Sequence, residues 1–249
     1  MTAAKTDSLT EALGQFRLAF YLLLSRAFSR EPDTDTLKGM EQVSAVLMEA
    51  LELMEIPSDP DVQASKNLLK EFWPEFRHHP DRVVEDLSRE YASLFLGVGS
   101  KTVSPCESVY RSGAGLLYQS TLFEVQQLYG GIGMEKSEQY HEPDDHIAVE
   151  LMYMAKLCGM TGEAVNTDNK SGLRYLGLQQ QFLETHLTQW VSVFSQSLIA
   201  ATDSPFYRAV ALLLKGFVGI DHGLVELLIQ ELSLDDESES GRKEDESKQ

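Results

Sequence analysis

Apolar residues recur every three or four positions along most of this 249-residue chain. That spacing places them on one face of an α-helix, which has about 3.6 residues per turn. The pattern predicts helices at residues 9–28, 35–54, 62–76, 80–96, 108–128, 182–198 and 205–217, and another that starts near residue 144. No window alternates with the period of two that marks a strand, so we expect an all-α fold, a compact bundle of roughly ten or more helices.

Polar and glycine-rich segments divide this helical pattern. The segment 129–143 contains GGIG and predicts a hinge between two helical subdomains, residues 1–128 and residues 144–234 of a single domain. Residues 235–249 contain no apolar side chain and predict a disordered acidic tail. The connection at 97–107 is rich in glycine, serine and proline, and long loops of this kind often carry function.

Ionisable side chains that could bind a ligand are concentrated in the segment EPDDHIAVELMYM. Pro143 disfavours helical geometry in the residue before it, so a helix is expected to start just after it. Asp144 and Asp145 are good N-cap types, and their charge suits the positive end of a helix. His146 and Glu150 are four residues apart and share one helix face. The segment predicts either a half-exposed first turn that carries carboxylates and an imidazole, or simply a well-capped core helix.

Charge restricts the partners of the chain. Its 21 Lys and Arg residues stand against 39 Asp and Glu residues, which gives a net charge of −18. Such a chain repels nucleic acid and anionic membranes, and it favours basic partners. The two cysteines, Cys106 and Cys158, do not form a disulfide framework and fit a reducing compartment. The N-terminal segment lacks the apolar core of a secretory signal, and no apolar run is long enough to span a bilayer, so we expect a cytoplasmic protein.

Motifs of catalysis are missing from the sequence. There is no phosphate-binding Walker loop, no GxSxG motif and no CxxC pair. Cys106 has no histidine close to it in sequence, so an incidental thiol is favoured over a nucleophile. We therefore expect no enzymatic activity and no metal or cofactor. The alternative is a helical small-molecule or nucleotide-binding enzyme that uses a cluster of Asp144, Asp145, His146 and Glu150.

Three segments together resemble the TorD/DmsD family of cytoplasmic chaperones for molybdenum-containing redox enzymes. Residues 91–111, YASLFLGVGSKTVSPCESVYR, resemble the LF-x-G-P-G loop and P-x-ES-x-Y element of that family. Residues 142–154 resemble its E-P-D-(D/E)-H helix start, and residues 182–217 are similar to its FLxxHLxxW…FYxxxAxLL ending. Two positions depart from the pattern, because Val98 replaces the usual proline and Cys106 replaces a frequent aromatic residue.

The resemblance implies a function for the acidic charge. Members of this family bind the twin-arginine signal peptide of a specific apoenzyme and delay its export until the cofactor is inserted. Such a peptide has two adjacent arginines followed by an apolar stretch. Its acceptor needs an apolar groove that ends in carboxylates, because arginine pairs with a carboxylate through two parallel hydrogen bonds. A helical scaffold without peptide specificity is the third interpretation.

The resemblance also implies where the peptide binds. The expected peptide-binding residues are Tyr91, Leu94, Phe95, Pro105, Cys106, Glu107, Tyr110, Glu142, Pro143, Asp144, Asp145, His146 and Glu150. The first three are expected to line the groove, Pro105 and Cys106 to form one wall, and Asp145 with His146 to form the polar end. The resemblance leaves room for weak guanine nucleotide binding, and the hinge permits a monomer or a domain-swapped dimer.

Overall fold

A computed structural model describes residues 3–54, 56, 59–98, 101–111, 115–137 and 140–246, with side chains placed between residues 11 and 234. The elements are α1 (Ala3–Ser29), α2 (Thr34–Leu53), α3 (Pro60–His78), α4 (Pro80–Phe95), α5 (Glu107–Arg111), α6 (Ser120–Gly131), α7 (Ile147–Val165), α8 (Asn169–Phe182), the π-helical turn η1 (Leu183–Leu187), α9 (Thr188–Ala201) and α10 (Pro205–Glu246). The described residues form no strand, and the predicted all-α fold is confirmed.

Local sequence signals explain where several helices begin. The carboxylate of Asp33 accepts a hydrogen bond from the backbone N–H of Thr36 and caps α2, and Asp59 caps α3 in the same way. Such caps satisfy backbone donors that have no partner inside the helix. Helix α3 continues through Pro74, although proline usually breaks or kinks a helix interior.

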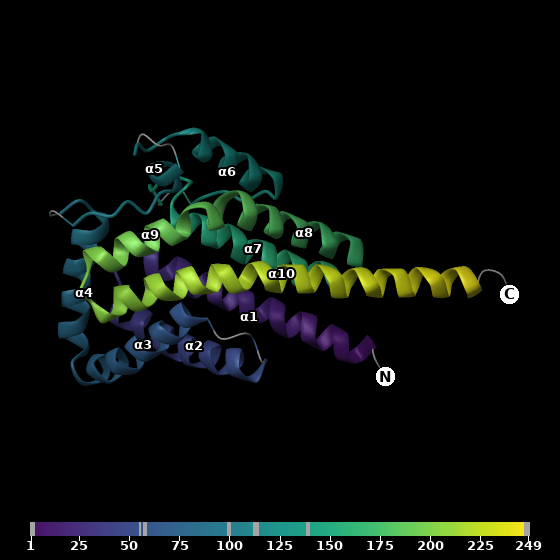
Figure 1. Ribbon diagram of the computed structural model, residues 1–249, viewed down its shortest axis with the longest axis horizontal. Coiled ribbons are helices and arrows are strands. Elements are labelled where there is room, and N and C mark those ends of the chain that lie inside the picture. The colour runs from purple at the N-terminus through teal and green to yellow at the C-terminus, as the bar shows by residue number, and fades with distance from the viewer. Residues whose placement is uncertain are drawn as a thin grey trace.

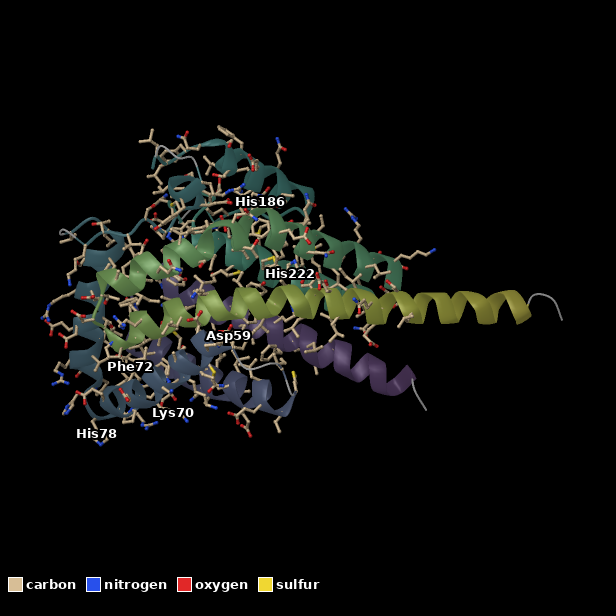
Figure 2. The ribbon with its side chains drawn as sticks, viewed as in Figure 1. Asp59, Lys70, Phe72, His78, His186 and His222 are labelled. Carbon is tan, nitrogen blue, oxygen red and sulfur yellow. The ribbon has the colours of Figure 1, made fainter. Side chains whose placement is uncertain are left out.

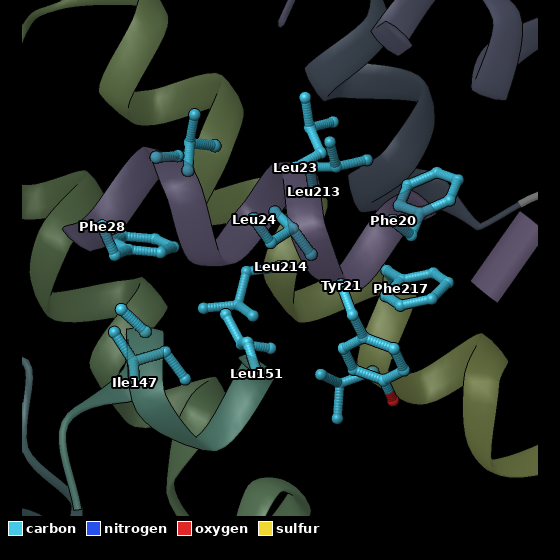
Figure 3. Close-up of a cluster of buried hydrophobic side chains, with 14 of the residues drawn as sticks. Phe20, Tyr21, Leu23, Leu24, Phe28, Ile147, Leu151, Leu213, Leu214 and Phe217 are labelled. Carbon is cyan, nitrogen blue, oxygen red and sulfur yellow. The ribbon is translucent and has the colours of Figure 1, made fainter. Parts of the chain in front are cut away.

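Helix α10 is the longest element and runs along the long axis of the molecule (Figure 1). It packs on α3, α8 and α9, while α1 lies against α7. Phe20 of α1 stacks on Phe217 of α10 with ring centroids 4.3 Å apart, within the buried cluster of Figure 3. One hydrophobic cluster contains residues from both predicted subdomains, such as Phe28 and Ile147. The segment 129–143 therefore joins parts that share a core.

The prediction of one helix over residues 108–128 is wrong. The described chain forms the short α5 and then α6, with residues 112–114 outside the described part. Between the two helices, Gly115 and Tyr118 have φ angles of +65° and +60°. A right-handed helix needs negative φ angles, so it cannot continue through these residues.

The tail also differs from its prediction. The backbone of residues 235–246 continues α10 as a helix that projects beyond the other helices, instead of the disordered segment that its composition predicts (Figure 1). The segment contains no proline, and its Glu, Lys and Arg residues are good helix formers that favour continuation of the helix. Residues 247–249, and residues 138–139 of the predicted hinge, lie outside the described part.

Candidate functional site

The loop before α5 and the start of α7 are joined side by side. The backbone N–H of Ile147 donates to the carbonyl of Pro105 over 2.8 Å, and the N–H of Glu107 donates to the carbonyl of Asp145 over 2.9 Å. These bonds flank an isolated antiparallel bridge between the two segments. The Asp145 carboxylate also accepts from the backbone N–H of Ser108, 2.9 Å away. Two of the segments singled out in the sequence are therefore in direct contact.

The first turn of α7 has a different cap from the one predicted. His146 is the N-cap, and its Nδ1 accepts from the N–H of Ala148 over 3.1 Å. The expectation that Asp144 or Asp145 caps this helix is wrong. Asp145 is instead engaged by α5, and Asp144 faces the preceding segment. The tertiary contacts of the two carboxylates leave the capping position to the imidazole.

Asp144 holds the segment that precedes α7. Its carboxylate accepts from Lys136 Nζ at 2.9 Å and from Gln126 Nε2 at 2.6 Å, and its carbonyl accepts from the Tyr129 hydroxyl at 3.0 Å. Partial burial raises the pKa of Asp144, but the hydrogen bonds and the Lys136 charge outweigh it and leave this pKa below its ordinary value. Lys136 also donates to the carbonyl of Glu142. These contacts tie residues 129–143 to the site.

A third segment, η1 with α9, completes a buried acidic cluster. Glu107 accepts from Arg111 Nη1 at 2.8 Å and from His186 Nδ1 at 2.9 Å. Glu150 accepts from Trp190 Nε1 at 3.1 Å. Figure 2 shows His186 on η1, and π-helical turns frequently mark functional sites. The three segments thus meet through hydrogen bonds between side chains that are remote in sequence.

Burial controls the charge of this cluster. Glu107 and Glu150 are both fully buried. Burial raises the pKa of Glu150 well above its ordinary value, and the neighbouring charge of Glu107 adds to the shift. The Cys106 thiol is also buried, which raises its pKa and leaves it protonated and unreactive.

The structure divides the expected peptide-binding residues into two groups. Buried residues are Tyr91, Leu94, Cys106, Glu107, Asp145, His146 and Glu150. Partly exposed residues are Phe95, Pro105, Tyr110, Glu142, Pro143 and Asp144. Of the two alternatives for this helix start, the half-exposed first turn is wrong, because Asp145 and His146 are buried where the loop before α5 meets the start of α7. Groove-lining positions such as Leu94, with 0% exposure, belong to the core.

Three residues of the cluster were missed in the sequence. Arg111, His186 and Trp190 were not among the expected site residues, although the HLxxW pattern contains the latter two. Trp190 also stacks on Tyr110 with centroids 5.5 Å apart. Hydrophobic periodicity assigns Trp190 to the core, and it carries no information about a carboxylate from a distant helix.

A polar pocket and several exposed apolar side chains lie close to α5 along the chain. A pocket of about 90 Å³ is lined by Arg111, Gln119, Ser120, Thr121 and Glu124. The neighbouring apolar side chains are exposed and are called here the α6 apolar surface, which comprises Leu116, Leu117, Tyr118 and Phe123. No group of three or more His, Cys, Asp or Glu side chains suited to a metal ion occurs within the described ranges.

Acid is expected to destabilise the protein through His146. Burial, with a smaller contribution from the Lys136 charge, lowers the pKa of His146 to about 3. The unfolded chain binds a proton at this imidazole below about pH 6.5, whereas the folded protein does not. The stabilisation is therefore complete above pH 6.5 and decreases as the pH falls toward 3. The loss is about 2 kcal/mol at pH 5.

The variant His146→Asn tests this expectation, because asparagine is a good N-cap that does not titrate. Urea unfolding at pH 7 and pH 5 is the measurement, and the variant should lose about 2 kcal/mol less than the parent on acidification. His78→Asn is the matched control, because His78 is exposed on α3. Equal acid sensitivity of the parent and His146→Asn would contradict the expectation.

Comparisons with known proteins cover most of the chain. The family described as nitrate reductase delta subunit matches residues 57–196, more than half of the 249 residues. The chaperone protein TorD of Aliivibrio fischeri is 28% identical over 210 residues, 84% of this chain and 94% of that protein. The chaperone protein TorD of Shewanella loihica is 26% identical over 212 residues, 83% of this chain and 92% of that protein. The family match contains the whole buried cluster.

Proposed function

The chain belongs to the nitrate reductase delta subunit family, the family of the TorD chaperones, and from this membership we propose that it binds the twin-arginine signal peptide of a molybdenum-containing redox enzyme and delays export until the cofactor is inserted. A chaperone role in redox-enzyme maturation, and not an enzymatic one, follows from the relatives, which are chaperone proteins. The apoprotein of the redox enzyme is the proposed client.

The observation that carries the proposal is the meeting of three sequence segments in one acidic cluster. Glu107, Asp145 and Glu150 come from α5 and the start of α7, and His186 and Trp190 reach them from η1 and α9. Carboxylates are the preferred partners of arginine, and the net charge of −18 attracts a basic peptide before contact. Within this cluster, Glu107 is the candidate partner of an incoming arginine, because its ion pair with the partly exposed Arg111 connects it to the surface.

The enzyme alternative finds less support in this geometry. It requires Asp144, Asp145, His146 and Glu150 to face a substrate together. Instead Asp145 and Glu150 are fully buried, and the Nδ1 of His146 is engaged as a helix cap. A general acid or base must reach the proton that it transfers, so this arrangement favours a structural role for these four residues.

A cytoplasmic location is part of the proposal, since the signal peptide must be bound before export. No helix among the described residues is long and apolar enough to cross a membrane. Weak guanine nucleotide binding and a choice between monomer and domain-swapped dimer stay predictions from the resemblance. Neither prediction depends on the residues of the peptide site.

We expect the chain to bind a peptide with two adjacent arginines and an apolar stretch, and to bind it less tightly as salt increases. Salt screens exposed charges, whereas apolar contacts persist. Isothermal titration calorimetry at low and high ionic strength measures both contributions. A peptide with both arginines replaced by glutamine should bind at least tenfold less tightly, because each charge-assisted hydrogen bond contributes about 1.5–3 kcal/mol. Equal affinity for the two peptides would favour the scaffold interpretation.

A further inference from the structure

Arg111 joins the protein surface to the buried cluster. Its side chain is 32% exposed, yet its Nη1 binds the fully buried Oε1 of Glu107 at 2.8 Å and the carbonyl of Thr185 at 2.7 Å. The other carboxylate oxygen of Glu107 is bound by the buried His186. One side of this carboxylate is therefore closed from within the core, and the other is closed by a side chain that can move into solvent.

A pocket lies against Arg111. Arg111 is one of its five lining residues, and its volume is about 90 Å³. Glu124 supplies a second carboxylate at the pocket, and the hydroxyl of Thr121 is buried there without a hydrogen-bond partner. Thr121 is only 5% exposed, so its unpaired hydroxyl is available to a group that enters the pocket. These features suit a cationic donor.

The cluster behind Arg111 contains an acceptor without a partner. Oδ1 of Asp145 is buried and has no hydrogen-bond partner. Buried polar atoms usually have partners, because an unpaired one destabilises the fold. The acidic cluster therefore has acceptor capacity that its own side chains do not use.

The α6 apolar surface adjoins the same pocket along the chain. Tyr118 is 64% exposed and Phe123 is 61% exposed, although large apolar side chains are usually buried. Tyr118 also has a φ angle of +60°, a strained conformation for an aromatic residue. Apolar side chains beside a pocket that holds the carboxylate of Glu124 match a peptide in which an apolar stretch follows arginine.

We propose that this pocket receives an arginine of the client peptide, and that Arg111 occupies the place of that guanidinium on Glu107 until the peptide displaces it. The inference rests on the proposed function. Arg111 acts as an internal competitor: the incoming arginine replaces its bond to Glu107, while Arg111 moves into water. A peptide without arginine offers no such replacement and leaves the pocket closed. The exchange thus makes binding selective for arginine.

The test compares Arg111→Gln with the parent. Its probe is a synthetic peptide with two adjacent arginines followed by an apolar stretch, studied by calorimetry on the full chain. Removal of the competitor should tighten binding about ten- to hundredfold, the equivalent of one charge-assisted hydrogen bond. Arg89→Gln is the matched control, since Arg89 is an exposed arginine of α4 paired with Glu85 and Asp86. It changes the net charge equally and should bind like the parent.

Arg111→Lys keeps the experiment decisive if the glutamine variant unfolds. Lysine retains the charge but loses the planar fork of arginine, so its peptide affinity should lie between those of the parent and Arg111→Gln. Unchanged or weaker peptide binding by a folded variant at position 111 would overturn the inference while the proposed function stands. Failure of the parent and of all variants to bind would overturn both.

The location is tested with exposed apolar residues. Phe123→Ser removes part of the α6 apolar surface and should weaken peptide binding about tenfold, since a buried aromatic side chain contributes about 1.5–3 kcal/mol. Val46→Ser is its control, because Val46 is 65% exposed on α2, away from the pocket. Equal peptide affinities for these two variants would place the peptide elsewhere and overturn the location.

Discussion

Asp221→Ala is expected to destabilise the protein by about 3–5 kcal/mol, because it leaves the buried guanidinium of Arg17 without its carboxylate partner. Asp221 of α10 binds Arg17 of α1 through both carboxylate oxygens, at 2.5 and 3.0 Å. It also accepts from the hydroxyl of Tyr21. All three side chains are at most 1% exposed. Burial opposes the charge of Arg17, but the Asp221 carboxylate raises the Arg17 pKa above its ordinary value, so the guanidinium stays charged.

Urea unfolding followed by circular dichroism measures this loss. The control is the double variant Arg17→Met with Asp221→Leu, which removes both charges and keeps the apolar volume. It should recover most of the loss, because an ion pair replaced by packed apolar side chains is often neutral. An Asp221→Ala protein within about 1 kcal/mol of the parent would contradict the prediction, since it would mean that water reaches Arg17.

Trp190→Ala is expected to produce a comparable loss of about 3–5 kcal/mol. Trp190 is fully buried, lies beside Phe194 and Tyr110, and donates from Nε1 to Glu150. The alanine variant loses the packing and also leaves Glu150 without its hydrogen bond. Thermal and urea unfolding measure the total effect. A loss below about 2 kcal/mol would show that the surrounding helices close the cavity.

Trp190→Phe separates the two contributions. It keeps most of the aromatic packing but removes the donor to Oε2 of Glu150, so the expected loss is about 1–3 kcal/mol. In a Glu150→Met background the same change should have a much smaller effect. A double-mutant cycle over these variants measures the coupling. Equal losses in the two backgrounds would assign the whole effect to packing.

The two positions occupy different parts of the family pattern. Trp190 lies within residues 57–196, which match the family, and it supports the acidic cluster. Arg17 and Asp221 lie outside that stretch and fasten α1 to α10. We therefore expect Asp221 variants that remain folded to bind the arginine peptide like the parent, whereas Trp190 variants alter both stability and binding.

Local patterns in the sequence determined most of the helices. Periodic apolar residues located α1, α2, α4 and the apolar part of α10, because helical periodicity is a property of neighbouring residues. The same reasoning failed at α5 and α6, where apolar positions are compatible with one helix but the positive φ of Tyr118 is not. No residue type at position 118 signals that conformation, since bulky aromatics rarely adopt it.

The segments of the candidate site could also be found in the sequence, but the arrangement of their side chains could not. The sequence left open whether Asp145 and His146 lie at a half-exposed helix start or on a core helix, and the structure buries both. Glu107 is bound by His186, a residue 79 positions away. Composition and local spacing determined the helical class, the acidic charge and the motif segments. Only the tertiary structure decided which carboxylates are buried and that Arg111 closes one of them, because burial and ion pairing depend on contacts between residues far apart in the chain.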